Sequence, residues 1–196
     1  MEKSLLVDTL SFDISPDVVN ESINNGKQLL VSGILQRANA KNFNGRIYPS
    51  DILKREVDKY HTHCVKERRA MGELDHNDSN VVNLNNVSHN IVDLKWEGDN
   101  LVGRIEILST PSGNILKELF KSGIKLGISS RGLGSLKKDN EGNDIVQEDY
   151  DLICWDFVSS PSVPGAYVFP DMLNEGKNNN NKYDKINKII REILIG

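Results

Sequence analysis

The chain has 196 residues, which is enough for one domain of ordinary size with its own hydrophobic core. Its formal net charge is −4, so it carries no basic excess to neutralise phosphates, and its aromatic share of 6% offers little material for base stacking. No apolar run approaches the roughly eighteen residues of a membrane-spanning helix, so we expect neither nucleic acid nor a membrane as a partner.

The two cysteines and the first residues indicate the compartment. Cys64 and Cys154 lie far apart without a CxxC spacing, which excludes a thiolate zinc cluster and fits a reducing environment. Residues 1–4 lead into an apolar patch that is too short for a signal peptide. We therefore expect a soluble protein made in a cytoplasm.

The first quarter of the chain predicts a leader, a strand and a helix. Residues 1–27 are rich in Ser, Asp, Pro and Asn, which indicates an irregular leader arm. Residues 28–36 have the pattern of a strand buried on both faces. A helix of about four turns follows Ser50, a plausible N-cap. Its predicted buried face consists of Leu53, Val57, Tyr60 and Cys64.

The next part predicts three strands. Residues 70–76 resemble a short strand that ends at His76 in a polar loop. Residues 81–97 and 101–108 alternate as strands, and Glu-Gly-Asp-Asn between them indicates a hairpin turn, so the two should pair antiparallel. In the second strand of the hairpin, Arg104 and Glu106 are expected to face water.

A second helix is predicted from Thr110, because Thr can cap a helix and Pro at its first position gives up only an N–H without a partner. The predicted buried stripe is Ile115, Leu116, Leu119 and Phe120. Gly123 is placed to end the helix in a left-handed conformation.

The strands that follow carry the candidate chemistry. Residues 124–131 predict a strand with Ser129 near its far end, and residues 140–143 predict a hairpin turn. A strand over about 150–158 would place Asp156 level with Ser129 if the two strands are neighbours. Together the elements predict an α+β fold, with a mostly antiparallel, barrel-like sheet and two main helices.

The end of the chain has a different composition. Residues 173–183 form an Asn-rich polar run that cannot bury enough apolar surface to fold, so we expect a flexible linker. Residues 184–196 have the spacing of a short amphipathic helix. The folded domain is then expected to span residues 28–172.

Ser129 is the candidate nucleophile of residues 127–135. A serine hydroxyl is inert at neutral pH unless a base takes its proton, so this interpretation needs a histidine and a group that orients it. The chain offers His76 as the base and Asp156 as the orienting group.

Two other interpretations of these residues remain open. In one, the segment is a glycine- and serine-rich turn and the protein is a scaffold or binding module. In the other, a metal ion is held by polar residues that lack any recognised ligand spacing. Those residues are Asp75, His76, Asp78 and His89.

A set of separated motifs, in order along the chain, resembles the prohead core maturation proteases of tailed bacteriophages. The motifs are Asn-Gly-Arg-Ile-Tyr-Pro at 44–49, Gly-Glu-Leu-Asp-His at 72–76, Val-Ser-His at 87–89, Thr-Pro-Ser-Gly at 110–113, Gly-Ile-Ser-Ser-Arg-Gly-Leu-Gly-Ser at 127–135, Asp-Phe-Val-Ser at 156–159 and Pro-Ser at 161–162. The resemblance covers roughly residues 29–170.

The resemblance implies a serine endopeptidase with a fold similar to assemblin, the herpesvirus capsid maturation protease. Such an enzyme works inside the immature capsid in the host cytoplasm, where it degrades scaffold and core proteins and trims the major capsid protein. It implies no cofactor and no metal, and it is compatible with a homodimer or a higher oligomer. The alternative is a catalytically silent scaffold component of the same prohead.

The resemblance also implies residue roles. Ser129 rather than Ser130 is the nucleophile and His76 is the base, although Asn77 stands where a proline commonly follows this histidine. Asp156 is the expected third member of the triad. The alternative third member is His89, which precedes the serine in sequence.

Two further expectations come from the resemblance. Ser130, Arg131 and Gly132 are expected to support the oxyanion. A family preference for cleavage after glutamate, with an aliphatic residue two positions earlier, predicts self-cleavage between Glu175 and Gly176.

Overall fold

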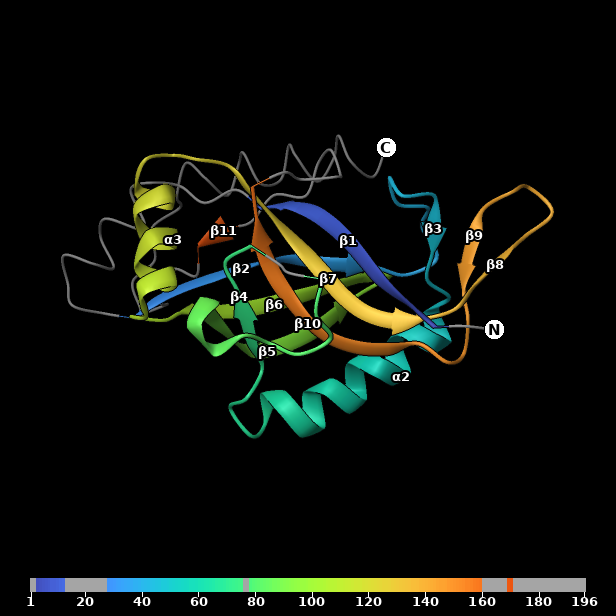
Figure 1. Cartoon of the computed structure of the whole chain (residues 1–196), viewed down its shortest axis with the longest axis horizontal. Coiled ribbons are helices and arrows are strands. Elements are labelled where there is room, and N and C mark those ends of the chain that lie inside the picture. Colours follow the sequence, from blue (N-terminus) through green and yellow to red (C-terminus); the bar gives the residue numbers. More distant parts are fainter. Residues whose placement is uncertain (1–2, 13–27, 76–77, 160–168, 171–196) are drawn as a thin grey trace, which may run out of the picture.

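The structure is a computed structural model that describes residues 3–12, 28–75, 78–159 and 169–170 (Figure 1). Within these ranges the strands are β1 (Ser4–Phe12), β2 (Leu29–Arg37), β3 (Arg46–Ile47), β4 (Met71–Glu73), β5 (Val87–Glu97), β6 (Asn100–Ile107), β7 (Leu126–Gly134), β8 (Leu136–Lys138), β9 (Asp144–Val146), β10 (Asp151–Val158) and β11 (Phe169–Pro170). The helices are α2 (Ser50–Tyr60), the π-helical η1 (His61–Val65), the 3-10 helix η2 (Leu84–Asn86) and α3 (Pro111–Lys121). The predicted α+β class is confirmed.

The described strands form three sheets. One has the order β1-β7-β10, the second has the order β11-β2-β6-β5-β4, and the third has the order β3-β9-β8. All the strand pairs are antiparallel except β3 with β9. The mostly antiparallel arrangement expected from the sequence is therefore also confirmed.

The two larger sheets meet along their edges. Leu74, directly after β4, forms a parallel bridge with Phe157 of β10, and the N–H of Asp75 donates to the Phe157 carbonyl at 2.7 Å. At the other side, β1 lies against β2. Figure 1 shows β1, β7 and β10 crossing in front of β2, β6 and β5. The two sheets thus enclose one core.

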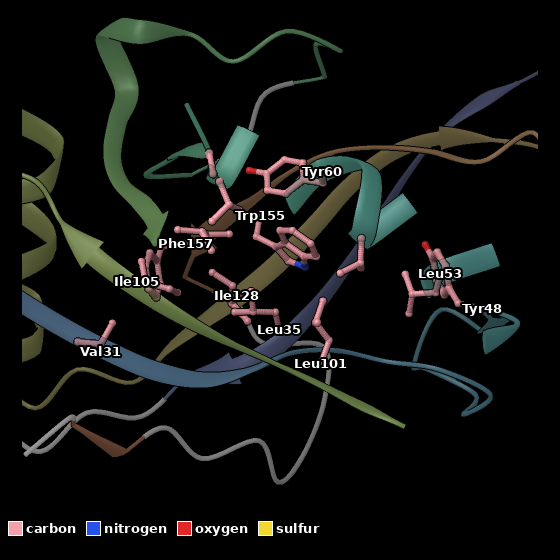
Figure 2. Close-up of a cluster of buried hydrophobic side chains, with 14 of the residues drawn as sticks. Val31, Leu35, Tyr48, Leu53, Tyr60, Leu101, Ile105, Ile128, Trp155 and Phe157 are labelled. Atoms are coloured by element: carbon pink, nitrogen blue, oxygen red, sulfur yellow. The ribbon is translucent and has the colours of Figure 1, made fainter. Parts of the chain in front are cut away.

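That core is filled from both sheets and from α2. Figure 2 shows Val31, Leu35, Leu101 and Ile105 opposite Ile128, Trp155 and Phe157, with Leu53 and Tyr60 of α2 at one side. Tyr60 and Trp155 meet edge to face with centroids 5.2 Å apart. Such buried aromatic pairs add stabilisation beyond the area they remove from water.

Helix α2 has the predicted apolar face but a different cap. Pro49, not Ser50, is the N-cap, and the N–H of Ser50 donates to the Asn39 side chain at 3.0 Å. A neighbouring loop thereby satisfies one N–H that the start of a helix leaves without a partner. Helix η1 continues α2 directly, so the predicted length of about four turns is confirmed.

Helix α3 begins as predicted. The Thr110 side chain caps it by accepting from the N–H of Gly113 at 3.0 Å, with Pro111 at the first position. Gly123 has a φ of 70°, as expected for the end of the helix. One member of the predicted stripe is wrong, because Ile115 is 54% exposed while Leu116 and Phe120 are buried.

The predicted hairpin is confirmed as β5 and β6, with two corrections. Strand β5 begins at Val87 rather than at residue 81, since residues 81–83 are not in a strand and η2 occupies residues 84–86. Glu106 does not face water. It is buried, and its Oε2 accepts from the Arg68 guanidinium at 3.0 Å, which compensates its charge.

The leader arm is wrong for residues 4–12, which form the regular strand β1 beside β7. The expected linker at 173–183 and the expected helix at 184–196 lie outside the described residues. No described helix is long and apolar enough to cross a membrane.

Candidate active site

Strand β7 carries the candidate nucleophile in the centre of the three-stranded sheet. Since successive side chains of a strand point to opposite faces, Ser129 and Arg131 share one face while Ile128 and Ser130 share the other. Ile128 belongs to the hydrophobic core. Ser129 and Arg131 therefore lie on the face of this sheet that is turned away from the hydrophobic core.

Ser129 lies directly opposite Asp156. The two residues are Cα partners in the antiparallel register of β7 and β10, as the sequence predicted for neighbouring strands. Directly opposed side chains have Cβ atoms roughly 4.5–5.5 Å apart. The Ser129 side chain is buried, and its Oγ has no hydrogen-bond partner among the described residues.

Arg131 is the cation of this face, and its guanidinium is fully buried. Nη2 donates to Oε1 of Glu73 at 2.7 Å, and Nη1 donates to the carbonyl oxygen of Ser79 at 2.8 Å. Nε lies 3.0 Å from Oδ2 of Asp156, an ion pair whose angle departs from hydrogen-bond geometry. One arginine thus connects β7 with β4, β10 and the loop after β4.

Glu73 completes the cluster three residues before His76. Its N–H donates to Oδ1 of Asp156 at 2.9 Å, while its Oε1 also accepts from the N–H of Asn83 at 3.0 Å. Its Oε2 accepts from the side-chain amide of Asn86 at 3.4 Å. Both oxygens of this buried carboxylate are therefore used.

Asp156 and Cys154 differ from exposed groups in their protonation. Burial raises the pKa of Asp156 above its ordinary value, against the opposing hydrogen bond from Glu73 and the charge of Arg131. A carboxylate here takes up a proton more readily than an exposed one. Burial also raises the pKa of the Cys154 thiol, so this cysteine is a neutral neighbour of Arg131 and Asp156 rather than a nucleophile.

His89 lies on β5 with both ring nitrogens in contact with protein atoms. Nδ1 lies 2.9 Å from the Ser88 hydroxyl and Nε2 lies 3.0 Å from the Trp155 carbonyl. Burial lowers its pKa to about 4, so the ring is neutral at neutral pH. A Cβ at Gly72 would lie 2.4 Å from this ring, which explains the glycine of the Gly-Glu-Leu motif.

The other two predicted support residues lie beside Ser129 on β7. The Ser130 hydroxyl points to the opposite face and donates to the carbonyl of Asp8 at 3.4 Å. Gly132 is packed against Tyr150, where a Cβ would lie 2.5 Å from the ring. Close packing thus requires a glycine at position 132.

The structure brings together Ser129, Asp156 and Arg131. Among the described residues, His89 instead contacts Ser88, Trp155 and Phe157. His76, Glu175 and Gly176 lie outside the described residues. Glu73 and Cys154 were missed by the sequence interpretation. A signal for Glu73 was present, since an arginine in a strand of small and apolar residues needs a buried counterion.

No group of three or more His, Cys, Asp or Glu side chains within the described ranges is arranged to hold a metal ion. The polar atoms of the cluster contact one another instead. The arrangement offers a serine hydroxyl opposite a carboxylate, with a buried arginine on the same face.

Comparison with known proteins identifies relatives of this chain. Residues 14–178 match the family model described as prohead core protein serine protease. The chain is 36% identical over 152 residues to the prohead core protein protease of Enterobacteria phage T4, which covers 76% of this chain and 72% of that relative. The solved structure of the bacteriophage T4 capsid assembly protease matches with a TM-score of 0.70 and 31% identity, over 81% of this chain and 99% of that one. The resemblance found in the sequence motifs is confirmed, and the chain belongs to the prohead core protein serine protease family.

Proposed function

We propose that this protein is the serine endopeptidase of phage prohead maturation, with Ser129 as nucleophile, His76 as general base and Asp156 as the group that orients the imidazole. The observation that carries the proposal is the position of Ser129, whose hydroxyl lacks a described partner and lies opposite a buried carboxylate. The hydroxyl would attack the peptide carbonyl and form an acyl-enzyme, which water then hydrolyses.

The path of the backbone supports His76 as the base. The N–H of Glu73 donates to Asp156, and two residues further along the chain the N–H of Asp75 donates to the carbonyl of Phe157. Asp75 has a φ of 63°, a left-handed conformation that is uncommon outside glycine. The chain is thus fixed beside β10, the neighbour of the strand that carries Ser129, one residue before His76.

Asp156 is favoured over His89 as the third member. His89 already has a partner at each ring nitrogen, and it lies on β5 rather than beside β7. If Asp156 orients the imidazole, Asp156→Asn should lower turnover by orders of magnitude because the wrong tautomer becomes favoured. His89→Gln should retain turnover. Turnover is measured with a peptide whose cleaved bond follows a glutamate. The reverse pattern would make His89 the third member.

For the oxyanion we propose support from the segment of Ser130, Arg131 and Gly132, whose backbone pairs with β1 and β10. The guanidinium of Arg131 is committed to Glu73, Ser79 and Asp156. A donor aimed at the developing oxyanion typically contributes about 2.7–4 kcal/mol in serine proteases.

A fluorophosphonate probe tests the nucleophile. Labelling of the wild type and of Ser130→Ala, but not of Ser129→Ala, is the expected result, and Ser130→Ala is the matched control one residue away. The probe should be applied over a wide range of protein concentration, because Ser129 is buried and association of copies could alter its access. No labelling at any concentration would favour the silent scaffold component.

The names of the T4 relatives, a prohead core protein protease and a capsid assembly protease, support the proposed substrates and location. We propose that this chain acts inside the prohead, in the host cytoplasm, on scaffold and core proteins and on the major capsid protein. The contacts of β10 with β4 and of β1 with β2 are compatible with a closed, herpesvirus-protease-like barrel. The protease domain would comprise β1 together with residues 28–172, with a homodimer or higher oligomer as the assembled form.

A further inference from the structure

Glu73 links three separate parts of the candidate site. Its side chain contacts Arg131 on β7, its N–H contacts Asp156 on β10, and it accepts hydrogen bonds from Asn83 and Asn86 of the loop after β4. Arg131 reaches the same loop independently through the carbonyl of Ser79. The described loop residues 78–86 are thus held to the nucleophile strand by one buried ion pair.

The buried ion pair of Glu73 and Arg131 does more than fill space inside the protein. Removing an ionised pair from water is unfavourable, and such pairs often add little to stability compared with apolar residues of the same size. Here the charged groups also bind backbone atoms of a loop, which apolar residues could not do. Glu73 and Arg131 are both 0% exposed, so water cannot replace either partner.

We infer that Glu73 is a positioning residue of the protease, which sets the loop that follows β4 against the strand that carries Ser129. This inference rests on the function proposed above. Glu73 acts through Arg131 and through the loop backbone rather than on the substrate.

Glu73→Gln is the informative variant because it keeps the size of the side chain. One of its two acceptor oxygens becomes an NH₂ group, which is a donor. In the position of Oε1 this group would face the donors of Arg131 and Asn83, and in the position of Oε2 it would face the donor of Asn86. At least one of the present contacts must therefore be lost. Glu106→Gln is the matched control, since Glu106 is also buried and paired with an arginine but lies on β6.

Amide hydrogen exchange tests the anchoring without any reference to catalysis. In Glu73→Gln, the amides of residues 78–86 should exchange about tenfold faster or more, because loss of a buried charged contact favours local opening. In Glu106→Gln the same amides should be unchanged. Equal exchange of this loop in the wild type and Glu73→Gln would overturn the inference. Melting curves of both variants establish that each is folded.

A double-mutant cycle tests whether the anchoring matters through the proposed base. Glu73→Gln should lower the rate of fluorophosphonate labelling by about tenfold or more when His76 is present, and by less than about twofold in a His76→Ala background. An equal loss in both backgrounds would indicate a merely structural role and overturn the inference. Absence of labelling in the wild type would instead refute the proposed function, while the exchange result would still report on the anchoring.

Discussion

At the scale of the residue, His89 links the stability of the fold to pH. Its ring is buried between Ser88 and the Trp155 carbonyl and meets Phe157 edge to face at 4.8 Å. Burial lowers its pKa from 6.5 to about 4. The folded protein therefore binds fewer protons than the unfolded chain between these two pH values, and its free energy of unfolding should rise with pH across that window.

We predict that His89→Gln flattens this part of the stability profile. The amide can keep a contact with Ser88 or Trp155 but does not titrate. Between pH 7 and pH 4 the wild type should lose about 3 kcal/mol more unfolding free energy than the variant, because only the wild type has the buried histidine. Urea unfolding at several pH values measures it. Parallel profiles for the two proteins would contradict the prediction.

The candidate site could be predicted from the sequence only in part. Ser129 and Asp156 could be placed in neighbouring strands because each lies in an apolar, strand-like segment. Glu106 could not be recognised as buried, because a glutamate is mostly exposed unless a partner is present, and Arg131 indicated a buried counterion without identifying it as Glu73. The partners, Arg131 and Arg68, come from elements that only the folded chain brings near.

At the scale of the element, β1 depends on the Asn-Gly-Arg-Ile-Tyr-Pro motif. The carboxylate of Asp8 accepts from the side chains of Asn44 at 2.7 Å and Arg46 at 3.2 Å, and also from the Tyr48 hydroxyl. Asn44 and Arg46 also donate to the carbonyl of Val7. This motif therefore holds β1 in its position beside the strand that carries Ser129.

We predict that Asp8→Asn loosens β1 specifically. The loss of a buried charge partner of Arg46 should lower the free energy of unfolding by about 1.5–3 kcal/mol. Amides of residues 4–8 should exchange faster, as measured by hydrogen exchange. Asp144→Asn is the control, because Asp144 makes a surface ion pair with Lys138, a type that contributes only about 0–1 kcal/mol. A similar effect of both variants on β1 would rule out the assigned anchoring.

Local signals explain why some elements could be predicted and β1 could not. Thr110 and Pro111 specify the start of α3 within two residues, and Gly98 marks the β5–β6 turn with a φ of 59°. Strand β1 instead pairs with a segment more than a hundred residues away. Asp8 and Ser130, which are in contact, are separated by 122 positions in the sequence. The pairing of β1 with β7 is therefore determined by long-range tertiary contacts, and no local turn signal in the sequence indicates it.

At the scale of the whole molecule, the two sheets and their shared core make the site a product of distant segments. Strands β4, β7 and β10 each contribute one charged residue to the buried cluster, namely Glu73, Arg131 and Asp156. None of these strands could position the cluster alone. The site therefore forms only when the edges of the two sheets meet at Leu74 and Phe157.

The chain contains a candidate cleavage site for its own proposed activity. The sequence Leu173-Asn174-Glu175 places an aliphatic residue two positions before a glutamate, which is the cleavage preference that the family resemblance implies. From its composition, the following run of Gly, Asn and Lys is expected to be a linker, and proteolysis favours such segments. We predict self-cleavage between Glu175 and Gly176, which would release residues 176–196.

Intact-mass analysis during prolonged incubation measures this cleavage. The wild type should lose the terminal segment, whereas Ser129→Ala should keep its full length because it lacks the nucleophile. Glu175→Gln should retain activity on a peptide substrate while its own chain stays intact, which separates loss of the cleavage site from loss of catalysis. Trimming of Ser129→Ala at the same bond and rate would point to a contaminating protease and refute self-cleavage, as would an active wild type that keeps its full length.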